Sequence, residues 1–352
     1  MSLAILWFIV LALLWCGFLF LEGFDYGVGM LHYFVGRDDD ERRVAINAIG
    51  PVWDGNEVWL IVAGAGMFAA FPEWYATMFS GFYLALVLLL VALIIRGVSF
   101  EFRGQGQGAA WRRTWDTTLT VGSFLIPVLV GCALGNLLRG VPIDARHEYT
   151  GSFFTLLNPY SLFVGVTVML LCLAHGASFL ALKTSGPVHD RAEHLGGYLA
   201  PLATLAVVGF TIWTLAMVHH AARAPVPVVA VLAMLAATWS VRSHRDGWAF
   251  LATAVAMLAT VATIFVFLYP HVMVSSTAAV NSLTVSNASS SSYTLKVMTV
   301  VTAIFFPIVL IYQGWTFYVF RRRISVADVR GGGSGGQAPA AATGSAGATG
   351  GR

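Results

Sequence analysis

Apolar residues follow one another along most of the chain in runs of about twenty, and polar residues gather between those runs. A transmembrane helix needs about 20 mostly apolar residues, because each residue adds 1.5 Å across a hydrocarbon core about 30 Å thick. By this rule we predict about nine transmembrane helices, near residues 3–33, 54–71, 74–100, 114–138, 158–183, 197–220, 225–241, 247–270 and 293–320. The pattern therefore predicts an all-α, polytopic membrane protein.

The predicted helices show a weak internal echo. Glu22-Gly23 interrupts the first helix, and His175-Gly176 interrupts the fifth at a similar depth. This echo favours two four-helix bundles plus one extra helix, although chance in glycine-rich membrane helices explains it equally well. We assign residues 1–325 to the transmembrane domain. Residues 326–352, rich in Gly and Ala, are predicted to form a disordered cytoplasmic tail.

Basic residues gather in alternate loops between the predicted helices. One set of loops carries Arg37, Arg42, Arg43, Arg103, Arg112, Arg113, Lys183, Arg191, Arg242, Arg245, Arg321, Arg322, Arg323 and Arg330. The other set carries Arg139, Arg146 and Arg223. Cytoplasmic loops are the ones enriched in Lys and Arg. The C-terminus is therefore predicted to be cytoplasmic, and an odd number of spans places the N-terminus outside.

Four carboxyl groups lie where the predicted helices should meet hydrocarbon. Glu22 and Asp25 fall in the inner half of the first apolar run, and Asp54 and Glu57 begin the second. A charged side chain at this depth costs at least about 2.5–3.5 kcal/mol, so such residues usually serve an ion, a proton or a partner charge. Residues at i and i+3 share a helix face, so each pair forms one polar ledge. We predict a proton pathway from the cytoplasmic side to about mid-membrane.

Each acid also has a structural explanation. Asp54 suits an N-cap that accepts free N–H groups of the first turn, and such a role is compatible with proton relay. Glu57 in the first turn would favour the helix dipole. Glu22 and Asp25 have no capping role, and their structural alternative is pairing with Arg96 or with a partner subunit.

Two further polar residues stand inside apolar runs. For Arg96, at the inner end of the third predicted helix, snorkelling to the interface is the default. The sharper alternative is a counter-ion bound among the four acids. His175 lies in mid-helix, and a single histidine without a spaced partner is more often a hydrogen-bonded core residue than a haem or metal ligand. We assign no catalytic residue and no metal site to this chain.

The composition agrees with a membrane protein and narrows its partners. The chain has 352 residues, of which 58% are hydrophobic and 11% charged, whereas a soluble domain carries about 25% charge. The formal net charge of +3 gives no reason to expect a nucleic-acid partner. The three cysteines all fall in apolar runs without a CxxC spacing, where they act as small buried hydrophobes.

Specific runs of the sequence are typical of one family. GFDYGVG occupies residues 23–29, WDGNEVW occupies 53–59, RGVSFEFR occupies 96–103 and FTLLNPYSLFVG occupies 154–165. In these runs, and over nearly all of its length before the tail, the chain closely resembles subunit II of the cytochrome bd family of respiratory quinol oxidases.

This resemblance implies an enzyme complex in the bacterial cytoplasmic membrane that oxidises quinol on the outer side and reduces dioxygen to water. It implies that the haems, two of b type and one of d type, belong to the partner subunit I. Subunit II would form a pseudo-symmetric heterodimer with that partner, and small single-span subunits are further expected partners. Asp25 and Asp54 match the proposed channel acids of the family, and Glu22 stands at a position that is often Asp.

Two other functions suit the same residues. A proton-coupled secondary transporter also uses intramembrane acids and glycine-broken helices, but it would be colourless and self-sufficient. A purely structural scaffold would use the acids only to pair with arginine, and acid-to-amide variants would then keep turnover once assembled.

Overall fold

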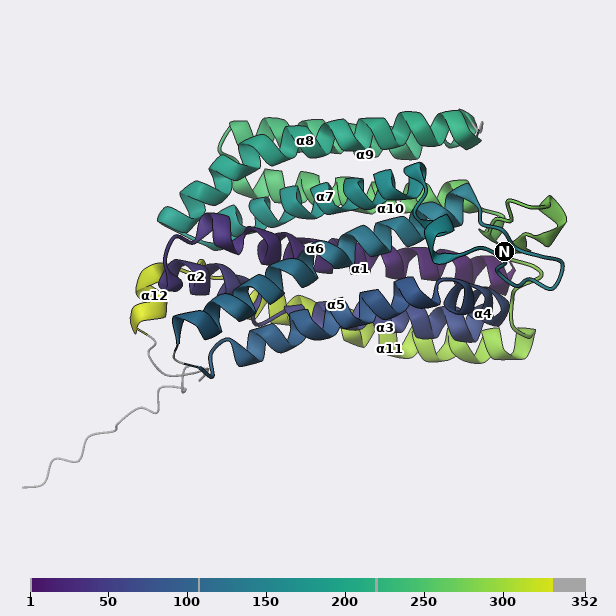
Figure 1. Cartoon of the computed structure of the whole chain (residues 1–352), viewed down its shortest axis with the longest axis horizontal. Coiled ribbons are helices and arrows are strands. Elements are labelled where there is room, and N and C mark those ends of the chain that lie inside the picture. The colour runs from purple at the N-terminus through teal and green to yellow at the C-terminus, as the bar shows by residue number, and fades with distance from the viewer. Residues whose placement is uncertain (1, 107, 219–220, 332–352) are drawn as a thin grey trace, which may run out of the picture.

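Long helices, aligned with one axis, make up most of the protein (Figure 1). The computed structural model describes residues 2–106, 108–218 and 221–331. The long helices in these ranges are α1 (Leu3–Val35), α3 (Trp53–Ala70), α5 (Tyr83–Phe102), α6 (Ala109–Arg139), α7 (Pro159–Lys183), α8 (Pro187–Val218), α9 (Pro225–Arg242), α10 (Asp246–Leu268) and α11 (Ser292–Val319). The shorter elements are α2 (Asp39–Ile49), α4 (Pro72–Gly81), α12 (Val326–Gly331), the 3₁₀ turns η1 (Phe153–Leu156), η2 (Ala221–Arg223) and η3 (Ala279–Asn281), and the antiparallel strands β1 (His271–Met273) and β2 (Leu283–Thr284).

The long helices form two groups that meet along α1 and α6. Helices α7, α8, α9 and α10 pack in a closed ring, and α1, α3, α5 and α6 form the second group. Helix α1 packs on α7 and α10, and α6 packs closely on α7, so these two helices join the groups. Helix α11 lies beside α3 at the edge of the molecule (Figure 1). This arrangement agrees with the predicted pair of four-helix groups and one additional helix.

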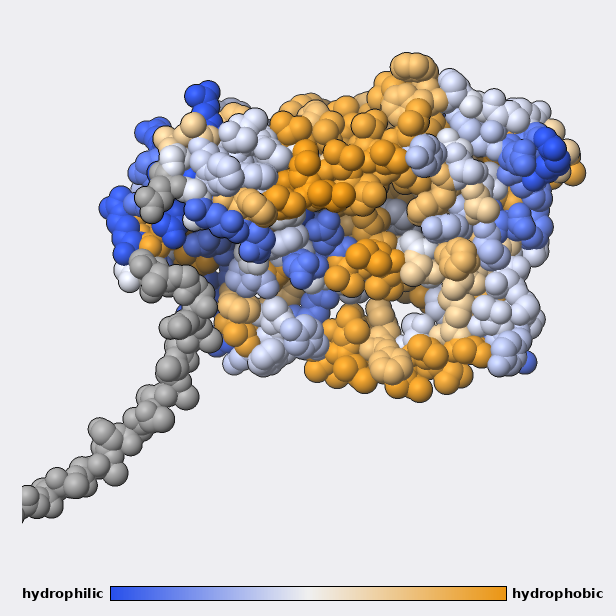
Figure 2. All heavy atoms as spheres, turned by 60° about the horizontal axis from the view of Figure 1, so that its bottom comes forward, coloured by the Kyte–Doolittle hydropathy of each residue, from blue (hydrophilic) through white to orange (hydrophobic). Residues whose placement is uncertain are grey.

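The two ends of the bundle differ in what they carry. Helices α2 and α12 lie at one end, which we call the α2 end, and the N-terminus and α4 lie at the opposite end (Figure 1). An apolar band lies between hydrophilic ends in Figure 2, as expected for a protein that crosses a membrane. Within the described ranges, eight helices are long and apolar enough to cross it. Helix α3 is not among them, because Asp54, Asn56 and Glu57 crowd its first turns.

The structure corrects three of the predicted boundaries. The predicted span 74–100 is broken, since α4 ends at Gly81 and α5 begins at Tyr83. The predicted span 197–220 begins ten residues earlier, at Pro187, and its residues 219–220 lie outside the described chain. The predicted tail begins with helix α12 at Val326, and residues 332–352 lie outside the described chain.

Glycines bring α1 and α7 unusually close together. A Cβ atom placed on Gly27 would lie 2.0 Å from the carbonyl oxygen of Cys172, and one on Gly176 would lie 2.5 Å from Cα of Gly27. Neither position has space for a side chain, so the two backbones touch. This contact fixes α1, and with it Glu22 and Asp25, against the ring of α7, α8, α9 and α10.

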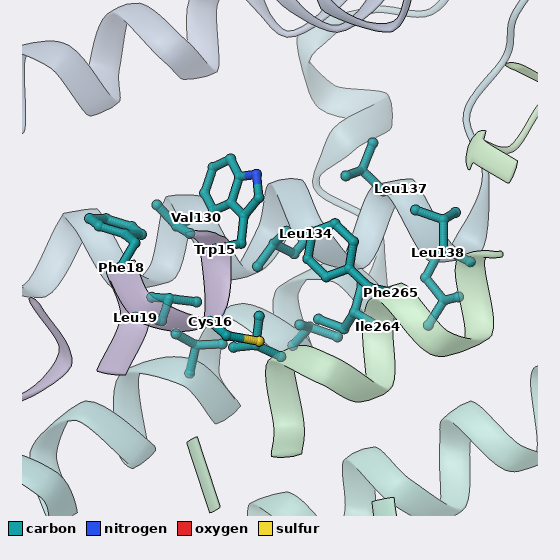
Figure 3. Close-up of a cluster of buried hydrophobic side chains, with 14 of the residues drawn as sticks. Trp15, Cys16, Phe18, Leu19, Val130, Leu134, Leu137, Leu138, Ile264 and Phe265 are labelled. Atoms are coloured by element: carbon teal, nitrogen blue, oxygen red, sulfur yellow. The ribbon is translucent and has the colours of Figure 1, made fainter. Parts of the chain in front are cut away.

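Apolar side chains fill the space between the two groups towards the end opposite α2. Figure 3 shows this core, in which α1, α6 and α10 meet through Trp15, Cys16, Phe18, Leu19, Val130, Leu134, Leu137, Leu138, Ile264 and Phe265.

A tight ion pair attaches α2 to α8. Both carboxylate oxygens of Glu41 accept hydrogen bonds from Arg191, at 2.7 and 2.8 Å, and Oε2 also accepts the Arg37 backbone N–H at 2.7 Å. The bonds from Arg191 hold the pKa of Glu41 at about 2, below its usual 4.5. Asp38 caps the same helix by accepting the Glu41 backbone N–H at 2.9 Å.

Candidate functional site

The predicted acids converge on one buried site between α1, α3 and α5. Glu22 and Asp25 are fully buried on one face of α1, nearer to the α2 end than to the opposite end. Glu57 approaches from α3 with 20% of its side chain exposed, and Arg96 approaches from α5 with no exposed area. Residues three and four positions apart on a helix share a face, which is why Glu22 and Asp25 point the same way.

Arg96 lies between the acids rather than at the membrane surface. Its Nη1 is 3.3 Å from Oε2 of Glu22 and 3.7 Å from Oε2 of Glu57. The guanidinium also lies over the rings of Tyr26, at 4.7 Å, and Phe100, at 5.3 Å, contacts that stabilise a cation electrostatically. The default expectation of snorkelling is therefore wrong for Arg96, whose side chain is enclosed by aromatic rings and carboxyl groups.

A chain of side-chain amides connects Asp25 to the outer helix α11. Oδ2 of Asp25 accepts a hydrogen bond from Asn56 at 2.7 Å, and Asn56 in turn accepts one from Gln313 at 2.9 Å. The Gln313 amide oxygen accepts the indole N–H of Trp59 at 2.9 Å. This chain sets the orientation of the Asn56 amide, so that its N–H faces the carboxylate.

Asp54 lies in the first turn of α3 and does not cap this helix. Helix α3 begins at Trp53, its N-cap is Val52, and no side chain caps it. Asp54 is the second residue of the helix and is exposed in this chain. The predicted N-cap role is therefore wrong, and the structure places Asp54 in the first turn at the α2 end, next to the helix dipole.

Several buried polar atoms of the site have no hydrogen-bond partner among the described residues. They are Glu22 Oε1, Glu22 Oε2, Asp25 Oδ1, Tyr26 Oη, Arg96 Nε, Arg96 Nη1 and Arg96 Nη2. Buried polar groups in proteins are normally hydrogen-bonded to protein or to ordered water. Because protein groups do not satisfy these atoms, the site is suited to hold water molecules in contact with carboxyl groups.

The charges in the site do not balance when every acid is ionised. Three carboxyl groups, Glu22, Asp25 and Glu57, surround a single guanidinium. An uncompensated charge in low dielectric is strongly unfavourable. Near-neutrality therefore requires bound protons or another cation, and this arrangement can take up and release protons as its surroundings change.

His175 lies next to the site but belongs to a satisfied core. Its Nδ1 is 2.8 Å from the Thr253 hydroxyl, and its Nε2 is 3.2 Å from the Phe20 carbonyl oxygen. Its ring stacks on Phe250 with centroids 4.6 Å apart. Both ring nitrogens are engaged and one ring face is covered, as expected for a hydrogen-bonded core histidine.

Sequence reasoning missed Asn56 and Gln313 as parts of the site. The signal for Gln313 was present, since it is an amide within an otherwise apolar run of α11. Asn56 gave no separate signal beside Asp54 and Glu57, because its full burial is visible only in the fold. Tyr26 was likewise passed over because an aromatic residue in a membrane helix is common.

These features define a multi-pass helical membrane subunit with a buried carboxyl site that is suited to hold water. The family model of cytochrome bd terminal oxidase subunit II matches residues 3–320. The chain is 43% identical over 329 residues to cytochrome bd ubiquinol oxidase subunit 2 of Bacillus subtilis, covering 92% of this chain and 97% of that one. It is 37% identical over 367 residues to cytochrome bd-I ubiquinol oxidase subunit 2 of Escherichia coli, covering 93% and 96%.

A solved structure shows the same fold. The bd oxidase from Geobacillus thermodenitrificans superposes with a TM-score of 0.73 and 19% identity, over 91% of this chain and 97% of the matched chain. The chain belongs to the family of cytochrome bd terminal oxidase subunit II. It is therefore a subunit of a quinol:oxygen oxidoreductase and forms a complex with subunit I. The predicted alternative of a proton-coupled transporter is wrong, because the relatives are oxidase subunits.

A bd oxidase is a haem-containing complex, and the two buried histidines in the described part of this chain lie against protein groups. His175 uses both ring nitrogens, and His32 directs one nitrogen at the Gly29 carbonyl and the other towards Asp116. Among the described residues these are the two buried histidines.

Proposed function

We propose that this subunit supplies the oxidase with protons through Asp54, Glu57, Asp25 and Glu22, with Arg96 as their counter-ion. The observation that carries the proposal is the row of acids from an exposed carboxyl at the α2 end to two fully buried ones. Carboxyl groups with unpartnered oxygens, spaced along a membrane helix, are the elements of a proton relay. The haems b and d lie in the partner subunit, which consumes the protons when dioxygen is reduced to water.

The α2 end is the cytoplasmic side in this proposal. Most basic loop residues, including Arg42 and Arg103, lie on that side of the sequence-derived topology, as the positive-inside rule requires. The N-terminus is then outside the bacterial cytoplasmic membrane and the C-terminus inside. Uptake of protons from the cytoplasm, combined with quinol oxidation on the outer side, builds a membrane potential without a pump.

Replacement of Asp25 by Asn tests the pathway. Asn keeps the size and can still accept the Asn56 hydrogen bond, but it does not release a proton in the working pH range. We expect quinol-driven oxygen consumption per haem to fall by about 10²-fold or more, as for loss of a general acid or base. The matched control is Glu73→Gln, which neutralises an exposed acid in the first turn of α4.

The haem content of each complex must be measured from its optical spectrum, since failed assembly would mimic a blocked pathway. A haem-replete Asp25→Asn complex that consumes oxygen at the parental rate would show that the acids act only as a scaffold.

The orientation has its own test. A reporter that is active only in the cytoplasm should work when fused after Arg330, and an externally active reporter should work near Ser289. The reverse result at either position would place the acid entrance on the outer side and remove the basis for cytoplasmic uptake.

A further inference from the structure

A second row of buried polar groups approaches Asp25 along the contact between α1 and α6. It begins at His32 in the last turn of α1, whose side chain has no exposed area. Nδ1 of His32 is 2.8 Å from the Gly29 carbonyl oxygen. A carbonyl only accepts hydrogen bonds, so Nδ1 must carry the proton. In the neutral ring, Nε2 therefore presents its lone pair.

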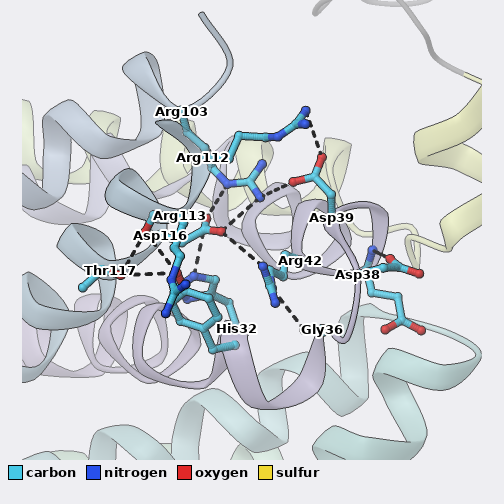
Figure 4. Close-up of polar contacts among 12 residues, drawn as sticks. His32, Gly36, Asp38, Asp39, Arg42, Arg103, Arg112, Arg113, Asp116 and Thr117 are labelled. Carbon is cyan, nitrogen blue, oxygen red and sulfur yellow. Dashed lines mark hydrogen bonds and ion pairs between the residues drawn. The ribbon is translucent and has the colours of Figure 1, made fainter. Parts of the chain in front are cut away.

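Nε2 of His32 faces the carboxylate of Asp116, which is already paired with two arginines. It lies 3.6 Å from Oδ1 of Asp116, and it has no hydrogen-bond partner among the described residues (Figure 4). The same Oδ1 accepts Nε of Arg103 at 2.5 Å, and Oδ2 lies 3.7 Å from Nη1 of Arg42. Asp116 is thus a carboxylate held in place by Arg103 and Arg42 directly beside Nε2 of His32.

The charged groups around this pair come from several elements and reach the surface. Asp39 of α2 pairs with Arg103 at 2.8 Å and with Arg112 at 3.6 Å, and 36% of the Asp39 side chain is exposed. The Arg42 side chain is 27% exposed, and Tyr33 contacts the His32 ring at 4.7 Å. Water therefore reaches the outer edge of the cluster, while His32 itself lies inside it (Figure 4).

Ser123 of α6 lies one helical turn further inward. A Cβ atom on Gly29 would lie 2.0 Å from its hydroxyl oxygen, so Ser123 sits directly against the α1 backbone. The hydroxyl is buried and has no partner among the described residues. Along α1, His32 to Gly29 is about 4.5 Å and Gly29 to Asp25 about 6 Å, at 1.5 Å per residue.

We propose that protons also reach Asp25 through His32 and Ser123, by a branch that is separate from the Asp54 entrance. A proton from water binds to the lone pair of Nε2 and leaves from the same nitrogen to a water on the inner side. Ser123 positions the waters between His32 and Asp25, and Asp116 is a positioning residue that holds the protonated ring. This inference rests on the proposed pathway, because both branches deliver to Asp25.

The rates of oxygen consumption of single and double variants distinguish two parallel proton branches from a merely structural role of His32. When two routes feed one site, their fluxes add, so removing either leaves the other. We therefore expect the residual rates of His32→Gln and Asp54→Asn to add up to about the parental rate. Each variant then loses less than about tenfold, and the product of the two losses stays far below the loss of the double variant. The double variant should lose as much as Asp25→Asn, about 10²-fold or more.

Two other patterns would overturn the branch. If the losses of the two single variants multiply in the double variant, His32 acts only through the structure. If Asp54→Asn alone is as slow as Asp25→Asn, or the double variant is no slower than the worse single variant, one route serves both residues. A full-rate Asp25→Asn complex would instead refute the pathway itself, and the two failures are therefore distinguishable.

Ser123 provides a second measurement that does not alter a charge. In the Asp54→Asn background, Ser123→Ala should slow turnover further, because the remaining branch loses the buried hydroxyl that lies against Gly29. The matched control is Ser178→Ala, since Ser178 is a buried helix serine whose hydroxyl already bonds the Ala174 carbonyl at 2.9 Å. Equal rates for the two alanine variants would overturn the role of Ser123 and the branch with it.

Discussion

The molecule contains two carboxyl–guanidinium pairs that differ in how tightly the groups are bound, Glu41–Arg191 and Glu22–Arg96. In the first, two hydrogen bonds of 2.7 and 2.8 Å lock the groups together. In the second, the closest atoms are 3.3 Å apart and neither Glu22 oxygen has a hydrogen-bond partner among the described residues. The hydrogen-bonded carboxylate of Glu41 holds two helices together, whereas the unpartnered oxygens of Glu22 are what the proposed relay needs to bind water and protons.

The largest effect should follow from removing the cation of the loose pair. Arg96→Met leaves buried carboxyl groups without compensation, and breaking a buried pair in this way costs about 3–5 kcal/mol. We expect a low yield of haem-replete complex and an early thermal loss of the haem spectrum. Adding Glu22→Gln to Arg96→Met should recover part of the yield. An Arg96→Met complex as stable as the parent would mean that the acids do not depend on this guanidinium.

The tight pair should affect stability without affecting turnover. Glu41→Gln removes a charged hydrogen-bond acceptor from Arg191, a loss of about 1.5–3 kcal/mol. We expect a lower temperature for loss of the haem spectrum at pH 7, with unchanged oxygen consumption per haem. Glu22→Gln, by contrast, should slow turnover. If Glu41→Gln slowed turnover of intact complexes to the same extent, the contrast between the pairs would not hold.

Acid should weaken the tight pair in a defined window. The pKa of Glu41 is about 2 in the folded chain and 4.5 without the Arg191 bonds. A lowered pKa means that the stabilisation is complete above pH 4.5 and is lost as the pH falls towards 2. The stability difference between the parent and Glu41→Gln should therefore be constant from pH 7 to about pH 5 and shrink below it. A difference that grew on acidification would contradict the assignment.

The smallest effect sets the baseline for both pairs. Glu73→Gln alters an exposed carboxyl group in the first turn of α4, at the end opposite α2. Surface substitutions of this kind usually change stability by about 0.5 kcal/mol or less. Thermal stability and oxygen consumption should both match the parent, and a larger change would indicate a contact of α4 with the partner subunit.

The parts of the site that depend on helix periodicity were predictable from sequence. The spacing of Glu22 and Asp25 places both on one face of any helix that contains them, and the structure has them so. The class of protein and its helices follow from the length of the apolar runs. The family followed from the GFDYGVG and WDGNEVW runs, and the family comparison confirms it.

The parts that depend on contacts between distant helices were not predictable. The break between α4 and α5 at Phe82 falls inside a continuous apolar stretch, where hydropathy gives no signal. The burial of Arg96 depends on Tyr26 and Phe100, which lie on two different helices. The hydrogen bond between Asn56 and Gln313 joins residues 257 positions apart. Sequence periodicity does not predict which residues of two such distant helices face each other.

The site is completed late in synthesis, because Gln313 is made after all the other residues of the site. Gln313 is carried by α11, the last long helix to leave the ribosome, and Leu295 is the only buried residue of that helix in the described chain. Elements made earlier can assemble before later ones arrive, so the acids enter the membrane well before the amide that orients Asn56. A nascent chain that stops short of α11 would contain every acid of the site and still lack the amide that orients Asn56 towards Asp25. A chain terminated before this helix would then insert its acids into the membrane but would not complete the site.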